Sequence, residues 1–425
     1  MGVTTSSIFG IAVCICYLVY TPVHGQSNND LYIYGFSQGI FNHKSISGEA
    51  FPVGRSSGLT VPSFSEGFES NSFSLHQTNL FLTKPINERT SFFLNAELLG
   101  SYSSSEQSGD LRLSEGWVSY TFSEQLKIKT GLLLPVFNNL NEINNRLPLF
   151  PYIIRPLVYE RLWSNLYVQE DYLPQTGYVQ LSGITSVSPT FDLEYAVQVG
   201  NSEQSYASDV NPRDAGAEGN EATALYRGEN LTTLLAYSGR IGLTNKQKTI
   251  KLGVSGSFDH DNKNESVNES ITRFPRDAEG NSVGLPVYGD VRRFRIGGDF
   301  SFHTEHVDFE AEFIRVLHDH SDIRSTPQLQ SANLNKFFAY GLVAYNVSEK
   351  LFGFGGVNYL QDESYEIILP DSPDAAGAYL ITAGGGWHFT DELVLKVQWS
   401  ESRFRDNEYV TLNSRFVTIG LGVIF

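Results

Sequence analysis

The feature that most constrains the fold is a two-residue alternation of apolar and polar side chains that recurs along the chain. In 391–400, for example, Val397 and Trp399 share one face while Lys396 and Gln398 share the other. Successive side chains of a β-strand point to opposite faces. The pattern therefore predicts an all-β chain whose strands have one apolar and one charged face.

Sixteen strands are predicted in this way, with fourteen or eighteen also compatible with the pattern. Their ranges are 31–41, 72–84, 90–101, 111–122, 126–135, 175–186, 190–200, 229–243, 247–259, 290–303, 306–318, 336–347, 350–360, 378–389, 391–404 and 415–425. The connections between them alternate between short and long. The first, at 42–71, is long, and the second, near Pro85-Ile86-Asn87, is short. Transmembrane barrels have short periplasmic turns and longer external loops, so this rhythm favours an antiparallel up-and-down β-barrel.

The charged faces indicate which side of such a barrel meets water. A Lys or Arg that faces lipid at mid-membrane costs about 2–4 kcal/mol, so the charged faces must line an aqueous interior. A soluble two-layer sandwich would place the apolar faces inward instead, and alternation alone does not separate the two folds. No stretch of eighteen apolar residues follows residue 25, which excludes membrane-spanning helices.

The two ends of the chain favour the membrane barrel. Residues 8–20 form an apolar run that is too short to span a bilayer and suits a secretion signal, with cleavage near Gly25. We therefore expect a signal peptide at 1–25 and a single barrel domain at 26–425. Both cysteines, Cys14 and Cys16, lie in the signal, so the mature chain would hold no disulfide and no thiol catalyst.

The last strand carries a resemblance to a known class. Residues 415–425 alternate apolar and small or polar side chains and end on Phe425. This segment resembles the closing strand of outer-membrane β-barrels of Gram-negative bacteria. The resemblance implies location in the cell outer membrane, contact with outer-membrane lipid and lipopolysaccharide, and recognition of Phe425 by the barrel assembly machinery.

A second resemblance rests on the predicted hairpin 115–122 and 126–135, followed by Asn141-Glu142-Ile143-Asn144 and Arg155-Pro156. This part of the chain resembles Gram-negative porins of the group related to phosphate-selective porins. The resemblance implies a homotrimer and a loop after the fifth strand, here 136–174, that folds inward and narrows the pore. The phosphate-selective members carry lysine clusters, whereas this chain mixes both signs of charge, so phosphate specificity does not follow.

The charged residues of this loop are predicted to form the pore constriction, because rings of charge set ion preference. They are Glu142, Arg146, Arg155, Glu160, Arg161, Glu170 and Asp171. The alternative is an external loop, or a loop that covers a trimer contact, with its charges paired. The strands are predicted to contribute the following lumen-lining residues: Lys127, Lys129, Glu115, Asp192, Glu194, Lys251, Arg293, Arg295, Asp299, Glu310, Glu312 and Lys396. Asp299 shares a predicted face with Arg293 and Arg295, and pairing with them is one interpretation.

The formal net charge of −17 argues against nucleic acid as a partner, because phosphates require basic patches. His318-Asp319-His320 would place two imidazoles on one strand face, but no cysteine or third histidine is nearby and only Asp322 could assist, so we predict no metal site and no cofactor. No nucleophile elbow is present, so we expect no enzyme activity.

The sequence therefore predicts a porin for passive diffusion of small hydrophilic solutes or ions. The alternatives are a non-conducting outer-membrane barrel, acting as an adhesin, a structural protein or a hydrolase, and a soluble secreted β-protein that binds glycans.

Overall fold

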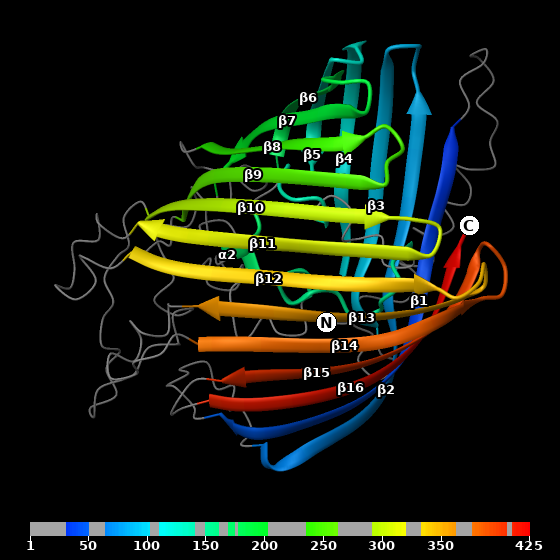
Figure 1. Ribbon diagram of the computed structural model, residues 1–425, viewed down its shortest axis with the longest axis vertical. Coiled ribbons are helices and arrows are strands. Elements are labelled where there is room, and N and C mark those ends of the chain that lie inside the picture. The colour runs from blue at the N-terminus through cyan, green and yellow to red at the C-terminus, as the bar shows by residue number, and fades with distance from the viewer. Residues whose placement is uncertain are drawn as a thin grey trace, which may run out of the picture.

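The computed structural model describes residues 31–50, 64–102, 110–140, 149–160, 169–174, 177–202, 235–261, 291–319, 333–362, 376–405 and 410–425. These residues form a closed barrel of sixteen antiparallel strands in which each strand pairs with its neighbours in sequence and β1 pairs with β16. In Figure 1 the strands β9–β14 of one wall cross over β2–β5 of the other. The predicted fold class is confirmed. The predicted signal at 1–25 lies outside the described residues.

The strands and short helices have the following bounds: β1 Tyr32–Ala50, β2 Phe64–Pro85, β3 Thr90–Tyr102, β4 Asp110–Ser123, β5 Leu126–Leu133, η3 Leu157–Tyr159, α2 Gln169–Tyr172, β6 Gly177–Ser186, β7 Phe191–Asn201, β8 Leu235–Asn245, β9 Ile250–Asp261, β10 Val291–His303, β11 Val307–Asp319, β12 Asn333–Asn346, β13 Leu351–Asp362, β14 Ala376–His388, β15 Leu393–Arg405 and β16 Val410–Ile424. Neither described helix is long and apolar enough to cross a membrane.

The first long connection is shorter than predicted, because β1 continues to Ala50 and β2 begins at Phe64. The prediction of a loop at 42–71 was wrong for these flanks. They carry polar residues on both faces, such as His43, which hydrogen-bonds Asn71 across the pair at 2.9 Å. A strand that extends beyond the apolar zone loses the alternation that identifies it in sequence.

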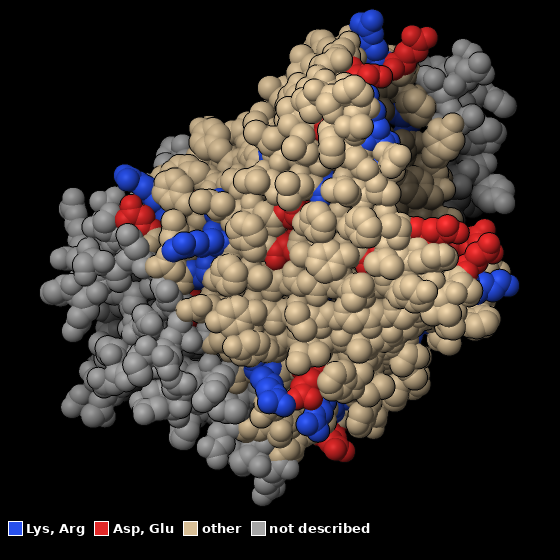
Figure 2. All heavy atoms as spheres, viewed as in Figure 1, with Lys and Arg blue, Asp and Glu red and all other residues tan. Residues whose placement is uncertain are grey.

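The outer face of the barrel is apolar. Neighbouring strands carry outward side chains that are largely exposed: Val197 is 54% exposed, Ile241 60% and Val254 61%. The strand β16 follows the same rule, with Leu421 at 50% and Phe425 at 58%. Figure 2 shows this broad uncharged surface, with charged side chains gathered mainly toward the ends of the strands. Because such a surface is unfavourable in water, it fits contact with lipid.

Outward aromatic rings flank this apolar band at both ends. Phe337, Tyr359 and Tyr379 form a row on β12–β14, with ring centroids 6.1 and 5.0 Å apart. Toward the short turns, Tyr345 is 53% exposed and Trp387 45%. Aromatic girdles at the two membrane–water interfaces are typical of transmembrane barrels, so the two rows mark the boundaries of the lipid-facing zone.

Two adjacent residues of β7 provide a test of this orientation. Val197 faces outward, whereas Ala196 faces inward, opposite Arg240 and on the face that carries Glu194. We expect Val197→Lys to lower the unfolding free energy by about 2–4 kcal/mol, because the ammonium would face lipid at mid-strand. Ala196→Lys should change it by about 0.5 kcal/mol or less. Urea unfolding in phospholipid vesicles measures both, and equal effects would contradict the assigned faces.

Candidate functional site: the loop inside the barrel

The segment after β5 leaves the barrel wall and enters its interior. Pairing of β5 with β6 shifts register between Thr130 and Leu133, and Gly131 has a φ of +129°. A Cβ at Gly131 would lie 2.2 Å from the carbonyl oxygen of Gly116 on β4, so only glycine fits there. Such an irregularity changes the direction of the chain. The strand β5 ends at Leu133 and is the shortest of the sixteen strands.

The first part of the loop is held by inward side chains of successive odd-numbered strands. The backbone N–H of Val136 donates to Gln198 Oε1 on β7 at 2.8 Å. The N–H of Asn138 donates to Ser255 Oγ on β9 at 2.9 Å. Because a loop inside a barrel has no neighbouring strand, wall side chains must satisfy its buried N–H groups.

Glu312 on β11 anchors the loop twice. Its Oε1 accepts a hydrogen bond from the N–H of Leu140 at 2.6 Å, and its Oε2 accepts one from the Tyr159 hydroxyl at 2.8 Å. Burial and the Glu312 charge raise the pKa of Tyr159 well above its usual value, so the hydroxyl stays protonated and remains a donor. One carboxylate therefore fastens two loop positions that are far apart in sequence.

The second part of the loop is held by amides of β13 and β15. Gln398 Oε1 accepts the N–H of Ile153 at 2.5 Å and that of Ile154 at 2.9 Å. Asn358 Oδ1 accepts the N–H of Leu157 at 3.2 Å. The loop therefore reaches from β7 around to β15 along the inside of one wall.

Apolar packing fixes the loop to the same wall. Loop residues and inward residues of β11–β16 form one buried cluster, so packed side chains fill this half of the interior. The loop contributes Phe137, Leu140, Phe150, Tyr152, Ile154, Leu157, Val158, Tyr159 and Tyr172, and the wall contributes residues such as Ile314, Val316, Phe338, Leu342, Leu360 and Leu380.

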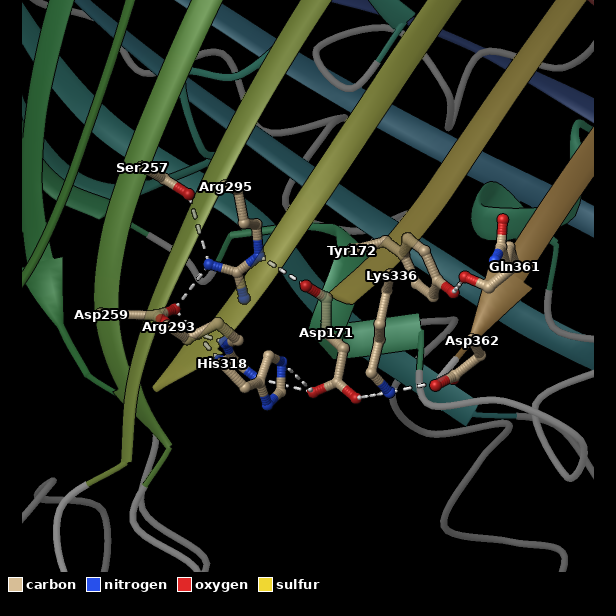
Figure 3. A network of polar contacts seen from close by, with 10 residues as sticks. All are labelled: Asp171, Tyr172, Ser257, Asp259, Arg293, Arg295, His318, Lys336, Gln361 and Asp362. Atoms are coloured by element: carbon tan, nitrogen blue, oxygen red, sulfur yellow. Dashed lines mark hydrogen bonds and ion pairs between the residues drawn. The ribbon is translucent and has the colours of Figure 1, made fainter. Parts of the chain in front are cut away.

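An ionic network ties helix α2 to the wall, as Figure 3 shows. Asp171 accepts from Arg293 Nη1 on β10 at 2.9 Å and from Lys336 Nζ on β12 at 2.8 Å. Lys336 also contacts Asp362 on β13 at 2.9 Å. The side chains of these four residues are 1–3% exposed. Their charges are therefore paired out of contact with water, where removal of one partner is costly.

The network continues on β9 and β10. Asp259 accepts from Arg293 Nε at 2.8 Å and from Arg295 Nη1 at 2.9 Å. Arg295 Nε also donates to the backbone oxygen of Asp171 at 2.8 Å. Asp299 instead pairs with Arg240 on β8 at 2.6 Å, so the interpretation that it pairs with Arg293 and Arg295 was wrong.

Three of the predicted constriction residues are described with their side chains. Arg155 and Glu160 pair with each other at 3.7 Å and are 10% and 4% exposed, and Asp171 is 3% exposed. Glu170 lies in α2, and its side chain lies outside the described residues, as do Glu142, Arg146 and Arg161. The charges seen in the loop thus hold it in place, and a role of the seven residues in constricting the pore stays a prediction.

The strand register directs all twelve predicted lumen-lining residues toward the interior. Eight of them form two contrasting groups. Arg293, Arg295, Glu312 and Lys396 lie on the loop-bearing wall and are at most 5% exposed. Lys127, Lys129, Glu194 and Lys251, by contrast, line a cavity of about 330 Å³ between β5 and β9 at the short-turn end.

Sequence reasoning missed the amide anchors of the loop. Gln198, Asn358 and Gln398 are at most 6% exposed, yet none was predicted as a site residue. The feature that could have identified them is their position on the inward, polar face of a strand. An amide side chain there can accept hydrogen bonds from a segment that lies inside the barrel.

No group of three metal-ligating side chains occurs in the part of the chain that the structure describes. Of the pair considered in the sequence, His320 lies outside that part. His318 Nε2 lies 3.7 Å from Asp171 Oδ1, at the edge of the ionic network.

Solved structures with this fold are outer-membrane proteins. The chain is similar to an anion-selective porin from Comamonas acidovorans, with a TM-score of 0.56, 10% identity and coverage of 94% of this chain and 100% of that one. It is similar to the outer membrane channel DcaP of Acinetobacter baumannii, with a TM-score of 0.54, 12% identity and coverage of 94% of this chain and 99% of that one. It is also similar to OmpF of Salmonella typhi, with a TM-score of 0.51, 13% identity and coverage of 93% of this chain and 98% of that one. No protein-family model and no curated protein sequence matches the chain. The barrel is thus of the kind found in Gram-negative outer-membrane proteins, porins among them.

A substitution at Gln398 tests how the loop is held. We expect Gln398→Leu to lower the unfolding free energy by about 2–4 kcal/mol, because two buried N–H groups, those of Ile153 and Ile154, would lose their acceptor. Gln361→Leu is the control, because only the backbone oxygen of Gln361 contacts the loop, at Tyr172, and its side chain accepts one part-buried hydrogen bond, from the Tyr359 hydroxyl of its own strand at 3.3 Å. Urea unfolding in vesicles should show the loss for Gln398→Leu alone.

Proposed function

We propose that the chain is an outer-membrane porin, through which small hydrophilic solutes or ions diffuse passively in a water-filled barrel narrowed by the loop after β5. The observation that carries this proposal is the combination of an apolar exterior with an interior loop and a charged cavity. Barrels of about sixteen strands enclose an aqueous channel. The mechanism needs no energy input and no catalyst, so we propose a channel and not an enzyme.

The loop gives this mechanism its geometry. It occupies the side of the lumen formed by β11–β15, so passage would follow the remaining space, which includes the cavity between β5 and β9. Charged groups remain there at the cavity between β5 and β9. A solute would enter between the long connections, pass the loop and leave past the short turns.

Swelling of vesicles tests the proposal. Lipid vesicles that contain the folded protein should swell in isotonic solutions of small sugars, and the rate should fall steeply as solute size rises. Vesicles that contain heat-unfolded protein provide the control. Swelling no faster than the control with every solute would overturn the proposal.

A non-conducting barrel is the second candidate, and the dense interior favours it. Asn79 and Asn95, which face inward on β2 and β3, are 0% exposed, as is Gln38 on β1. An adhesin or a structural protein would tolerate such filling. Intact barrels that bind a partner but give no swelling would support this alternative.

We also propose that the protein resides in the cell outer membrane, in contact with lipopolysaccharide, that Phe425 is read by the barrel assembly machinery, and that the assembly is a homotrimer. The exposed Phe425 at the end of β16 supports the second of these. Native mass spectrometry in detergent tests the trimer, and a monomer mass would contradict it.

A further inference from the structure

Two lysines on β5 differ from the cations of the ionic network described above. Lys127 and Lys129 occupy successive inward positions, about 7 Å apart along the strand. Neither ammonium makes an ion pair with any residue that the structure describes. By contrast, Arg293 and Lys336 on the opposite wall are each held by two carboxylates. The two lysines are therefore available to a ligand.

The cavity that they line has other charges, but these are largely matched. Arg240 donates through Nε and Nη2 to Asp299 at 2.9 and 2.6 Å. Lys251 pairs with Glu194 at 3.2 Å. Glu124, the other lining acid, belongs to the exposed β4–β5 turn. Lys127 and Lys129 are thus the two lining cations that contact no carboxylate among the described residues.

An indole directs the two lysines toward one point. Lys129 Nζ lies 4.8 Å and Lys127 Nζ 5.9 Å from the ring centroid of Trp117 on β4. Trp117 in turn stacks on Phe93 of β3, with centroids 4.9 Å apart and planes at 23°. A cation–π contact orients an ammonium but leaves its charge uncompensated. The two cations therefore lie near one another at the wall of an accessible cavity.

We propose that Lys127 and Lys129, oriented by Trp117, form a binding site for small oxyanions, carboxylate or phosphate, at the short-turn end of the channel and make the channel prefer anions. This inference rests on the proposed function. The net charge of −17 does not oppose it, because charges more than about 8–10 Å away are largely screened at physiological ionic strength. A cavity of about 330 Å³ holds a small acid together with water.

Reversal potentials under a KCl gradient test the preference. The wild type should favour chloride, and Lys127→Gln with Lys129→Gln should lower the anion-to-cation permeability ratio at least about threefold. Lys350→Gln is the matched control, because Lys350 lies in the exposed turn between β12 and β13 at the same end of the barrel. An unchanged ratio in the double variant would overturn the proposal.

Fluorescence tests binding without requiring conduction. Potassium acetate and potassium phosphate are titrated separately into the folded protein, and the signal of Trp117 is taken as the difference from Trp117→Phe. Saturable change with acetate, with phosphate or with both supports the site and identifies its ligand. The double variant should bind about tenfold more weakly, about 1.4 kcal/mol. No saturable change with either anion overturns the site, whereas binding without any conductance retains the site and overturns the porin function.

Discussion

Replacing Asp171 by alanine is expected to detach helix α2 from the barrel wall and to lower the unfolding free energy by about 3–5 kcal/mol, because Arg293 and Lys336 would each lose a buried partner. Asp259 would still contact Arg293 and Arg295, and Asp362 would still contact Lys336, so three cations would share two carboxylates. We expect the open-channel current of this variant to become noisy, since the loop end would move in the lumen.

Asp192→Ala is the control for this experiment. Asp192 also faces inward, but it lies next to a short turn, and among the described residues it accepts one hydrogen bond, an exposed one from Ser186 Oγ at 2.7 Å. Its removal should change the unfolding free energy by about 0.5 kcal/mol or less and leave the current quiet. Equal effects of the two substitutions would show that Asp171 does not fasten the loop.

Removing the loop should produce the largest change in conduction. A chain in which 137–172 is replaced by a short Gly/Ser linker should conduct at least about twice the current of the wild type, because the loop fills one side of the lumen. Single-channel recording measures this, and migration of the unheated protein on a gel confirms that the barrel has folded. An unchanged conductance would contradict the position of the loop in the conduction path.

Deletion of most of 262–290, a somewhat shorter segment, is the control. That segment is a long connection predicted to be external, and its loss should leave the single-channel conductance unchanged. Increased conductance in both deletions would mean that connections in general, and not the loop after β5, limit the current.

Much of the wall could be predicted from the sequence, because each strand has to keep lipid on one face and water on the other. The range predicted as 190–200 is β7 at Phe191–Asn201, and the range predicted as 391–404 is β15 at Leu393–Arg405. Where that two-sided constraint ends, as beyond Asn42 on β1, the alternation ends too, although the strand continues to Ala50. The pattern therefore reports the environment of a strand and not its length.

The interior was less predictable, because pairing across the lumen depends on three-dimensional register. Sequence placed Arg293 and Arg295 on the inner face, but not their attachment to Asp171, more than 120 positions earlier in the chain. The sequence placed Gln398 on the inner face of its strand, but it did not indicate that two backbone N–H groups of the loop donate to its side chain. The absence of a described carboxylate beside Lys127 and Lys129 likewise follows from what the fold places around them.

The most direct test of the central claim is a planar-bilayer recording of the purified protein whose folded state has been verified by its heat-modifiable migration. We predict discrete current steps that are proportional to voltage and that disappear when the protein is unfolded by heat before addition. A folded, membrane-inserted barrel that leaves the current at baseline would contradict the claim that this chain forms a water-filled channel.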